Sequence, residues 1–581
     1  MKKIPYRYAV ALTAALGLFM AVLDNTIVNV SLTAMLKSFS KQDPTITINT
    51  IQWVITGYFL SQAAVIPVAG YFSNRYGLRR MFIIALAIFT LGSFLCGFSH
   101  ELNTWLGGGG VPMLIGFRVF QGIGGGMLFP LATSISFNVF PPADRAKSSA
   151  VIAVPVLLAP TLGPTVGGLL VDSALEWPSI FFINVPVGAL AIFLIFRLLK
   201  ADFGRKPLWA GEGARPQSKS GATEAASVSG TPAATAAADA GSPPAAAKAR
   251  PAEAIVARNK FDFVGLFLSI VGTILVVYAF TVVSDTREGS VTPQNPNGDI
   301  YGWGYWLVWV LLGAGLAILG FFSVYELRLK DPVLDLRAYK NRDFLTASVM
   351  TWIVRAVIFG SFFILPLFLE RFKGMSAAMT GLALMPQGIG SAIGIISGSR
   401  IYDKVGPRVQ VIMGIVALTV SSVMLMNVSP ESDGWSFVPV LLIRGIGFGW
   451  SNLPLQTVSL SRFAGPALPK VSSLYNATAQ IFSSIGIAVL TTLLVTGITE
   501  RSNNAVQAAL AAHQRPDPNT IALNAAAGAM GNVFMYVSIG TALTVFFALF
   551  LPKKSLKQEQ EEAARRGENV SQAEQHAVIM E

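Results

Sequence analysis

Few ionisable side chains interrupt the long apolar stretches of this 581-residue sequence. Asp24 is the only acidic residue well inside such a stretch, and Arg118, Arg355 and Arg444 are the basic ones. A buried carboxylate is costly unless it is protonated or paired. A nearby arginine favours the charged form, whereas desolvation favours the neutral form. These residues predict Asp24 as a proton-binding group with Arg118 as its partner, and a permanent structural ion pair is the alternative.

Residue types that catalysis would need are scarce. The single cysteine, Cys96, excludes a disulfide framework and a cysteine metal site. The three histidines, His100, His513 and His576, lie outside the apolar stretches, and no Gly-x-x-x-x-Gly-Lys-Ser/Thr segment for binding phosphate is present. We therefore expect neither an enzyme nor a cofactor or metal site. Any pumping would draw on an ion gradient or on a separate ATPase.

The elements that must position the charged residues are long and apolar. Hydrophobic residues make up 53% of the chain and charged residues 13%, whereas soluble domains carry about 25% charged residues. A helix of about 20 apolar residues crosses roughly 30 Å of hydrocarbon. The sequence therefore predicts an all-α polytopic protein embedded in the lipid bilayer. We expect fourteen transmembrane helices, at residues 8–34, 48–72, 80–99, 110–134, 148–171, 178–199, 262–284, 304–327, 343–370, 376–399, 408–428, 436–460, 471–497 and 530–551.

The basic residues predict how these helices are oriented. Most of the 43 Lys and Arg residues fall in the termini and in the loops after even-numbered helices. Such an excess marks the cytoplasmic side of a cell membrane. Both termini are therefore predicted to be cytoplasmic, and the net charge of +12 reflects topology rather than a nucleic-acid partner. Residues 201–260, rich in Gly, Ala, Pro and Ser, are predicted to form a disordered cytoplasmic linker.

A short motif occurs twice between expected helices. The first copy includes Gly70 and runs through Asn74, Arg75, Gly77 and Arg79. The second copy contains Asp403, Gly406 and Arg408 at the same spacing as Asn74, Gly77 and Arg79. A glycine turn flanked by charges suits a tight hairpin between two helices, and two matching hairpins indicate a duplicated bundle, as in many transporters.

Further segments extend this pattern into a family resemblance. They are Leu23–Val30, Arg118–Gly126, Ala159–Gly168 and Trp177–Gly188. Together with the hairpins they resemble the major facilitator superfamily, and within it the fourteen-helix drug:proton antiporters of the EmrB/QacA type. Two positions depart from the family pattern: Asn74 stands where that family has Asp, and Ala159 where its antiporter motif begins with Gly.

The resemblance implies a major facilitator fold with two six-helix bundles and two inserted helices. The bundles would be residues 1–200 and 331–552, the inserted pair residues 261–330, and the cytoplasmic tail residues 553–581. It implies proton-coupled export of hydrophobic or amphipathic compounds across the cytoplasmic membrane by alternating access. A dedicated exporter of one endogenous metabolite is the alternative within transport, and a membrane-embedded enzyme or receptor is the alternative outside it. Whether a periplasmic adaptor protein takes part stays open.

Residues for binding and gating follow from the same considerations. Polar and aromatic groups in an apolar cavity suit amphipathic ligands, and Arg444 matches Arg118 in depth. Candidate substrate-cavity residues are Asn25, Asn29, Gln121, Trp352, Arg355, Tyr475, Asn476 and Gln480. Candidate gating residues are Gly70, Asn74, Arg75, Gly77, Arg79, Gly163, Pro164, Gly167, Gly168, Asp403, Gly406, Arg408 and Arg444.

Overall fold

The computed structural model describes most of the chain outside one long internal segment. The described residues are 5–41, 46, 48–99, 101–102, 110–171, 173, 176–199, 262–284, 287, 301–329, 332–427, 434–463, 467–511 and 517–566. The expected linker at 201–260 and the part of the expected tail beyond residue 566 lie outside these ranges.

Within the described ranges the chain forms helices and no β-strand, as expected for an all-α protein. The first part contains α1 (Tyr6–Ser40), α2 (Ile48–Tyr76), α3 (Leu78–Gly97), α5 (Gly110–Val139), the short η1 (Pro142–Asp144), α6 (Arg145–Val171), α7 (Ser179–Phe182) and α8 (Asn184–Leu198). The second part contains α10 (Phe263–Ser284), α11 (Trp306–Arg328), η2 (Leu336–Lys340), α12 (Arg342–Leu367), η3 (Phe368–Phe372), α13 (Ala377–Met426), η4 (Gly434–Phe437), α14 (Val438–Ser461), α15 (Ala467–Ala511), α16 (Pro518–Ala548) and α17 (Leu556–Arg565).

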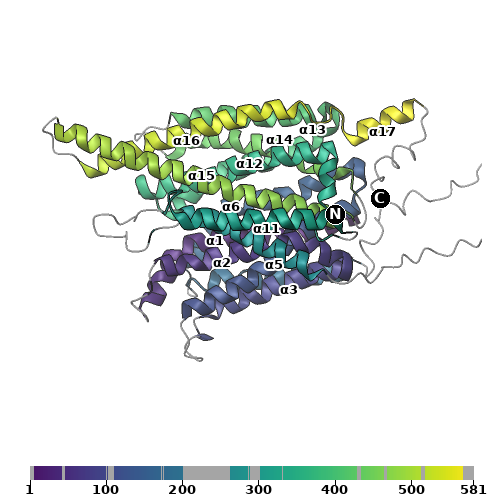
Figure 1. The fold of residues 1–581 in the computed structure, drawn as a ribbon, viewed down its shortest axis with the longest axis horizontal. Helices are drawn as coiled ribbons and strands as arrows, with labels where there is room; N and C mark the ends of the chain where they lie inside the picture. The colour runs from purple at the N-terminus through teal and green to yellow at the C-terminus, as the bar shows by residue number, and fades with distance from the viewer. Residues whose placement is uncertain are drawn as a thin grey trace, which may run out of the picture.

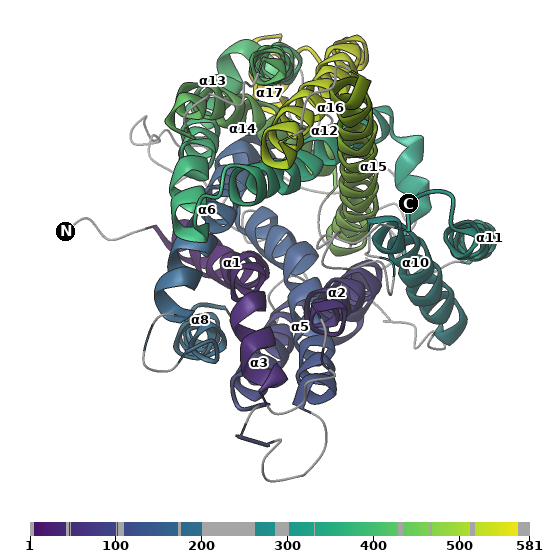
Figure 2. The same cartoon turned by 90° about the vertical axis from the view of Figure 1, so that its left-hand side faces the viewer.

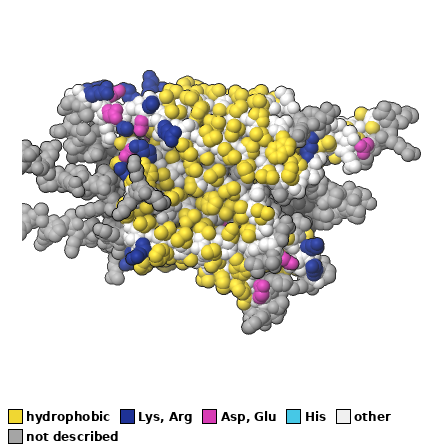
Figure 3. Space-filling model, turned by 180° about the vertical axis from the view of Figure 1, so that it is seen from behind, with side chains coloured by type: hydrophobic (Ala, Val, Ile, Leu, Met, Phe, Trp, Pro, Cys, Tyr) yellow, Lys and Arg dark blue, Asp and Glu magenta, His cyan; other side chains and the backbone are white. Residues whose placement is uncertain are grey.

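The long helices run side by side along the longest axis of the molecule (Figure 1). The start of α1 and the whole of α17 lie at one end of the bundle, which we call the terminal end, and the opposite end is the distal end (Figure 1). Apolar side chains form a broad surface belt, and Lys and Arg side chains gather toward the ends (Figure 3). This distribution is typical of a protein that crosses a bilayer.

Eleven of the described helices are long and apolar enough to cross a membrane. One of them, α13, covers two expected spans that meet at Gly406, where φ is +80°. α6 and α14 coincide with the expected spans 148–171 and 436–460 but are not among the eleven. α14 is rich in Gly and polar residues, which lower its apolarity. Each expected span thus coincides with a described helix, although apolar length alone does not identify all fourteen.

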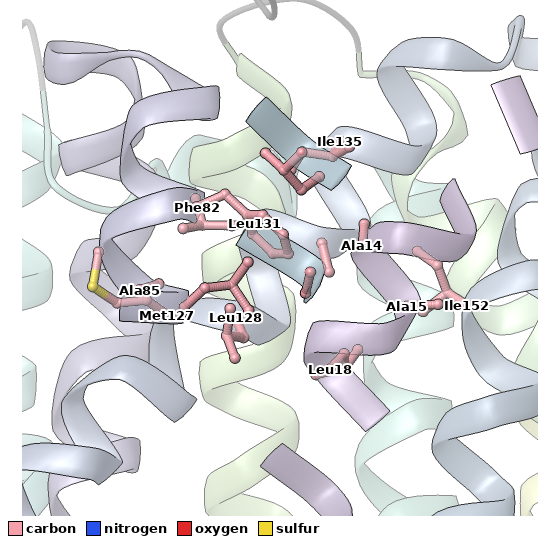
Figure 4. Packing of buried hydrophobic residues seen from close by; sticks show 14 of the residues in the cluster. Ala14, Ala15, Leu18, Phe82, Ala85, Met127, Leu128, Leu131, Ile135 and Ile152 are labelled. Atoms are coloured by element: carbon pink, nitrogen blue, oxygen red, sulfur yellow. The ribbon is translucent and has the colours of Figure 1, made fainter. Parts of the chain in front are cut away.

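Two groups of helices lie on opposite sides of the end-on view in Figure 2. One contains α1, α2, α3, α5 and α8, and Figure 4 shows part of its core, with Phe82 of α3 against Leu128 and Leu131 of α5. The other contains α12 to α16, with a core that includes Leu441 of α14 and Phe534 of α16. α10 and α11 pack on each other at the edge, where α10 also contacts α2 and α15.

Small residues set how closely the helices approach. A β-carbon on Gly124 of α5 would collide with the backbone of Phe89 in α3, and one on Gly445 of α14 would collide with the backbone of Gln387 in α13. In lipid, close packing of this kind replaces the hydrophobic effect as the main source of helix association. The glycines of α5 and α14 therefore allow close helix contacts in both groups.

Candidate functional site

Asp24 of α1 lies at the centre of a buried hydrogen-bonding network. Its Oδ2 forms a salt bridge with Nη1 of Arg118 in α5, at 2.5 Å. Its Oδ1 accepts hydrogen bonds from Nε2 of Gln121 at 3.1 Å and from Nδ2 of Asn184 in α8 at 2.9 Å. Asp24 and Arg118 are each 1% exposed, so the protein shields the pair from water. The contact expected from the depths of the two residues in their helices is therefore present.

Arg118 has further partners besides the aspartate. Its Nε donates to the backbone oxygen of Val54 at 3.2 Å, and its Nη1 donates to Oε1 of Gln121 at 2.8 Å. The guanidinium also lies over the ring of Tyr58, 4.2 Å from its centroid, and 5.5 Å from that of Phe181. Such cation–π contacts strengthen when they are desolvated. Arg118 is thus held by α2, α5 and α7 even if Asp24 no longer binds it.

Local sequence explains how these groups come together. Arg118 and Gln121 are three residues apart and therefore lie on one face of α5. A β-carbon on Gly92 of α3 would approach the backbone of Gln121 to 2.7 Å, and one on Gly125 would approach the hydroxyl of Tyr58 to 2.6 Å. The glycines thus let α2 and α3 pack directly against the part of α5 that carries the site.

The charge on Asp24 is linked to how α1 is packed. In a medium of low dielectric, the attraction between Asp24 and Arg118 and the desolvation of both groups are large and opposed. Protonation of Asp24 would neutralise the carboxylate, remove the ionic component of its link to α5 and leave Arg118 on its other partners. A change of charge at one atom would therefore alter how α1 is held against α5 and α8.

Arg444 occupies the matching place in α14 without an acidic partner among the described residues. Its Nη1 donates to Oγ of Ser422 at 2.8 Å and its Nη2 to Oγ of Ser361 at 2.7 Å. The guanidinium lies 5.4 Å from the ring centroid of Phe534. Arg444 therefore links α12, α13, α14 and α16 through neutral groups.

The expected cavity residues fall on different helices. Trp352 of α12 donates from Nε1 to Oγ1 of Thr478 at 3.0 Å and stacks on Phe482 of α15. The hydroxyl of Tyr475 pairs with Oγ1 of Thr351 at 3.2 Å. α12 and α15 pack along each other, so the structure brings the candidates of these two helices together.

The other cavity candidates differ in whether their polar atoms have hydrogen-bond partners. Nε of Arg355 in α12 is buried without a hydrogen-bond partner among the described residues, as is Oδ1 of Asn25 in α1. Asn476 donates to the backbone oxygen of Ser472 at 2.8 Å, and Gln480 is partly exposed. Asn25 and Gln121 belong to the opposite helix group, and the side chain of Asn29 lies outside the described part.

The two repeated hairpins make equivalent contacts. Gly77 has φ +93° and Gly406 has φ +80°, backbone conformations that favour glycine. Nη2 of Arg79 donates to the backbone oxygen of Phe196 at 3.1 Å, near the end of α8. Nε of Arg408 donates to the backbone oxygen of Leu551 at 2.8 Å, just after α16. In each helix group the motif arginine therefore fastens the end of the last long helix.

Some of the remaining motif residues pack between helices, and others lie at the ends of helices. Asn74 and Arg75 lie in the last turn of α2, and Asp403 pairs with Lys557 at 3.9 Å. β-carbons on Gly163 and Gly167 of α6 would meet Thr26 and Ile27 of α1, whereas one on Gly168 would meet nothing within 4 Å. The side chain of Pro164 is outside the described part.

α6 packs on α1 of the first helix group and on α13 of the second, and several contacts between the two groups lie at the terminal end. Nη1 of Arg145, which begins α6, donates to the backbone oxygens of Leu460 at 2.7 Å and Ser461 at 2.6 Å, at the end of α14. Oγ of Ser149 lies 3.0 Å from Oγ1 of Thr457.

A second link between the groups joins α2 and α15. The backbone N–H of Gly70 donates to Oγ of Ser473 at 2.8 Å, and a β-carbon at this glycine would approach the backbone oxygen of Pro469 to 2.5 Å. These contacts, together with those of Arg145 and Ser149, close the terminal end.

Sequence reasoning missed three residues that the structure makes prominent. Asn184 lies inside the quoted segment Trp177–Gly188, so its polar side chain in an apolar helix was an available signal. Arg145 was counted with the loop before α6, although it is fully buried. Glu326 lies at the end of the expected span 304–327 and was not singled out, although it is 1% exposed.

Comparison with known proteins places this fold. The family model described as Major Facilitator Superfamily matches residues 14–487. The chain belongs to the major facilitator superfamily. It is accordingly a multi-pass membrane transporter rather than an enzyme, and it acts on small-molecule substrates.

Relatives in the superfamily match along most of their length. An uncharacterized MFS-type transporter of Bacillus subtilis, YhcA, is 27% identical over 542 residues, which are 93% of this chain and 86% of YhcA. The multidrug resistance protein B homolog of Mycobacterium tuberculosis is 28% identical and covers 82% of this chain and 74% of its own length. The multidrug export protein EmrB of Escherichia coli is 28% identical, with 83% and 80% covered.

Solved structures of the superfamily share the fold. The proton:xylose symporter XylE aligns with a TM-score of 0.56 at 14% identity, over 96% of this chain and 99% of XylE. The human organic anion transporter MFSD10 aligns with a TM-score of 0.53 at 14% identity, over 94% and 100%. At this level of identity the likeness concerns the fold alone.

Proposed function

We propose that this transporter exports hydrophobic or amphipathic compounds across the cytoplasmic membrane in exchange for protons. The observation that carries the proposal is the buried salt bridge of Asp24 and Arg118, with Gln121 and Asn184 on the second carboxylate oxygen. The names of the relatives support the substrate class, since they include multidrug resistance proteins, EmrB and the lincomycin resistance protein LmrB of Bacillus subtilis.

Asp24 is the proton carrier in this mechanism and Arg118 sets its affinity. A proton that reaches Asp24 neutralises the carboxylate and frees α1 from the ionic link to α5. Loss of the proton restores the salt bridge, because Arg118 stays in place on Val54 and Tyr58. A membrane potential of 100 mV adds about 2.3 kcal/mol for each charge moved fully across, which corresponds to a gradient of roughly fiftyfold.

Alternating access would arise from motion of residues 1–200 against residues 331–552. The contacts of Arg145 with Leu460 and of Gly70 with Ser473 close the terminal end. Because Lys and Arg residues are concentrated in the termini and the loops on their side, we assign this end to the cytoplasm. The structure then corresponds to a state closed toward the cytoplasm, and export requires these contacts to break and re-form in each cycle.

Substrate would lie between the two groups, against Trp352, Arg355 and Tyr475 on one side and Asn25 and Gln121 on the other. The unpaired Nε of Arg355 and Oδ1 of Asn25 are available to a polar group of the substrate. The ring of Phe359, whose centroid lies 5.4 Å from the guanidinium of Arg355, suits molecules that combine apolar and polar parts.

Transport into proteoliposomes tests the proposal. Purified protein is reconstituted, a pH gradient is imposed, and accumulation of a fluorescent lipophilic cation is followed with and without an ionophore that dissipates the gradient. The expected result is gradient-driven accumulation by the wild type and its loss in Asp24→Asn, which keeps the shape of the side chain but cannot ionise. Asp343→Asn is the matched control, since Asp343 also pairs with an arginine, Arg462 at 2.6 Å, but is 22% exposed.

Two results would count against the proposal. Gradient-driven accumulation by Asp24→Asn at the rate of the control would remove Asp24 from coupling. Accumulation by the wild type that is indifferent to the ionophore would remove proton coupling altogether. A panel of chemically unrelated substrates separates a multidrug exporter from a dedicated exporter of one metabolite, because only the first transports several of them.

A further inference from the structure

A second buried carboxyl group lies far from Asp24 along the chain, in the inserted helix pair. Glu326 is in the last turn of α11 and is 1% exposed. Neither of its carboxylate oxygens accepts a hydrogen bond from the described residues under normal geometry, although the backbone N–H groups of Val333 and Leu334 lie nearby. A buried carboxylate without full hydrogen bonding is costly, and taking up a proton is the usual way to relieve that cost.

A second carboxyl group faces the same spot. Asp262 precedes α10, and its Oδ1 accepts hydrogen bonds from the backbone N–H of Gly265 at 2.8 Å and from the hydroxyl of Tyr325 at 3.0 Å. Its Oδ2 is buried without a partner. A β-carbon on Gly265 would collide with Oδ2 of Asp262 and with Oε1 of Glu326. The two unpartnered oxygens therefore flank one point, and only glycine at position 265 leaves room for them.

Residues of α2, α10, α15 and the segment after α11 surround this point. The segment after α11 packs with Val333 against Val68 and Tyr71 of α2, next to Leu266 and Ile270 of α10. Lys470, at the start of α15, is within electrostatic range of Glu326 and lies 5.9 Å from the ring centroid of Tyr71. The groups that can carry charge around Glu326 thus include Asp262, Tyr325, Tyr71 and Lys470. The guanidinium of Arg337 is also close along the chain, since it donates to the backbone oxygens of Leu327 and Leu329.

We propose that Asp262 and Glu326 form a carboxyl pair that binds one proton between them, as a protonation site distinct from Asp24. Two carboxyl groups at such short range do not both ionise readily, so the pair retains a proton that an isolated carboxyl group would release. A metal ion is a poorer occupant, since Ca²⁺ needs six or more oxygen ligands and the described residues contain no cluster of three metal-binding side chains.

The proton has a structural consequence. With it bound, the pair carries one negative charge opposite Lys470. Without it, two negative charges are buried between α10, α11 and α2, beside the contact of Gly70 with α15 that closes the terminal end. Loss of the proton to the aqueous phase at that end therefore weakens the packing of the inserted pair on both helix groups. This inference does not depend on the antiport mechanism.

Infrared spectroscopy of the purified full-length protein tests the proposal, because the C=O stretch of a protonated carboxylic acid is distinct from that of a carboxylate. The wild type is expected to show a protonated-carboxyl band at neutral pH that disappears as the pH is raised. In Glu326→Gln this band should be absent. In Asp262→Asn it should disappear at a pH lower by on the order of one unit, since the neighbouring charge is gone.

Controls separate this site from the proposed proton carrier. Asp24→Asn and Asp335→Asn should keep the alkaline titration of the band, because Asp335 only caps η2. A band that persists unchanged in Glu326→Gln, or a wild type without any alkaline carboxyl titration, would overturn the pair while leaving coupling at Asp24 untouched. Thermal unfolding gives a second readout, with stability falling more steeply above neutral pH in the wild type than in Glu326→Gln. Parallel curves would also contradict the proposal.

Discussion

Replacing Arg145 by methionine tests which contact closes the terminal end. Arg145 is fully buried, and its guanidinium donates to two backbone oxygens at the end of α14, in the opposite helix group. Methionine fills a similar volume without donors. The closed state would then leave the backbone oxygen of Ser461 without the donor that Arg145 supplies, and that of Leu460 with only the backbone N–H groups of Arg462 and Phe463. An open state would expose both oxygens to water. We therefore expect Arg145→Met to shift the equilibrium toward the state open at the terminal end.

The size of the shift follows from opposing contributions. Each hydrogen bond to a charged donor contributes about 1.5–3 kcal/mol, and Arg145 makes two. Burial of the guanidinium, whose Nε has no partner among the described residues, offsets part of this gain. A net effect of about 2 kcal/mol corresponds to a change of roughly thirtyfold in the equilibrium constant. Arg145→Lys keeps the charge with fewer donors and should give a smaller change.

Cysteine labelling measures this equilibrium. Cys96, the single native cysteine, is replaced by alanine, and Ser149→Cys supplies a thiol at a buried position that faces Thr457 across the closure. A membrane-impermeant thiol reagent applied from the terminal side should react roughly thirtyfold faster in Arg145→Met than in the parent.

Arg408 supplies the matched control for Arg145. Arg408 makes the same kind of contact, with the backbone oxygen of Leu551, but within one helix group. Arg408→Met should lower the unfolding temperature without changing the labelling rate. If Arg145→Met is labelled at the parental rate, Arg145 does not hold the closure. If Arg408→Met is labelled equally fast, the effect is general loosening.

Three further predictions concern other contacts. Gly70→Ala should accelerate the same labelling reaction, because its β-carbon would approach the backbone oxygen of Pro469 to 2.5 Å and separate α2 from α15. Arg444→Met should lower the unfolding temperature by an amount equivalent to about 1–3 kcal/mol, since the desolvation of the buried guanidinium offsets part of the two bonds lost, yet leave gradient-driven accumulation in proteoliposomes. Burial raises the pKa of Glu559 in α17 above its usual range, so docked α17 binds more protons than released α17. Docking should therefore tighten as the pH falls through this raised pKa. Hydrogen-exchange protection of α17, corrected for intrinsic rates, measures this, and a pH dependence in Glu559→Gln equal to that of the wild type would refute it.

The repeat that relates the two helix groups could be predicted from the sequence, because each copy of its motif lies within a few adjacent residues. Gly77 and Gly406 sit in hairpins whose turn needs positive φ, and that requirement is visible in a few adjacent residues. The fourteen apolar segments could be predicted for the same reason. A helix that crosses lipid must pair its backbone N–H and C=O groups within itself, and its apolar composition makes it recognisable in the sequence. Asp24 could be identified as a candidate because burying a lone carboxyl group in an apolar segment costs free energy whichever way its side chain points.

What sequence could not supply is which distant groups share one space. Asn184 completes the network on Asp24 from a helix 160 residues away, and Arg145 reaches the end of α14 from 315 residues away. Glu326 looked like the end of a span, and only the packing of the segment after α11 buries it beside Asp262. Sequence by itself determined that this protein is helical, spans a membrane and has a buried acid in α1. Tertiary structure decided which partners that acid has, which end is closed and where a second pair of carboxyl groups meets, because helix contacts in lipid depend on the fit of faces that no local pattern encodes.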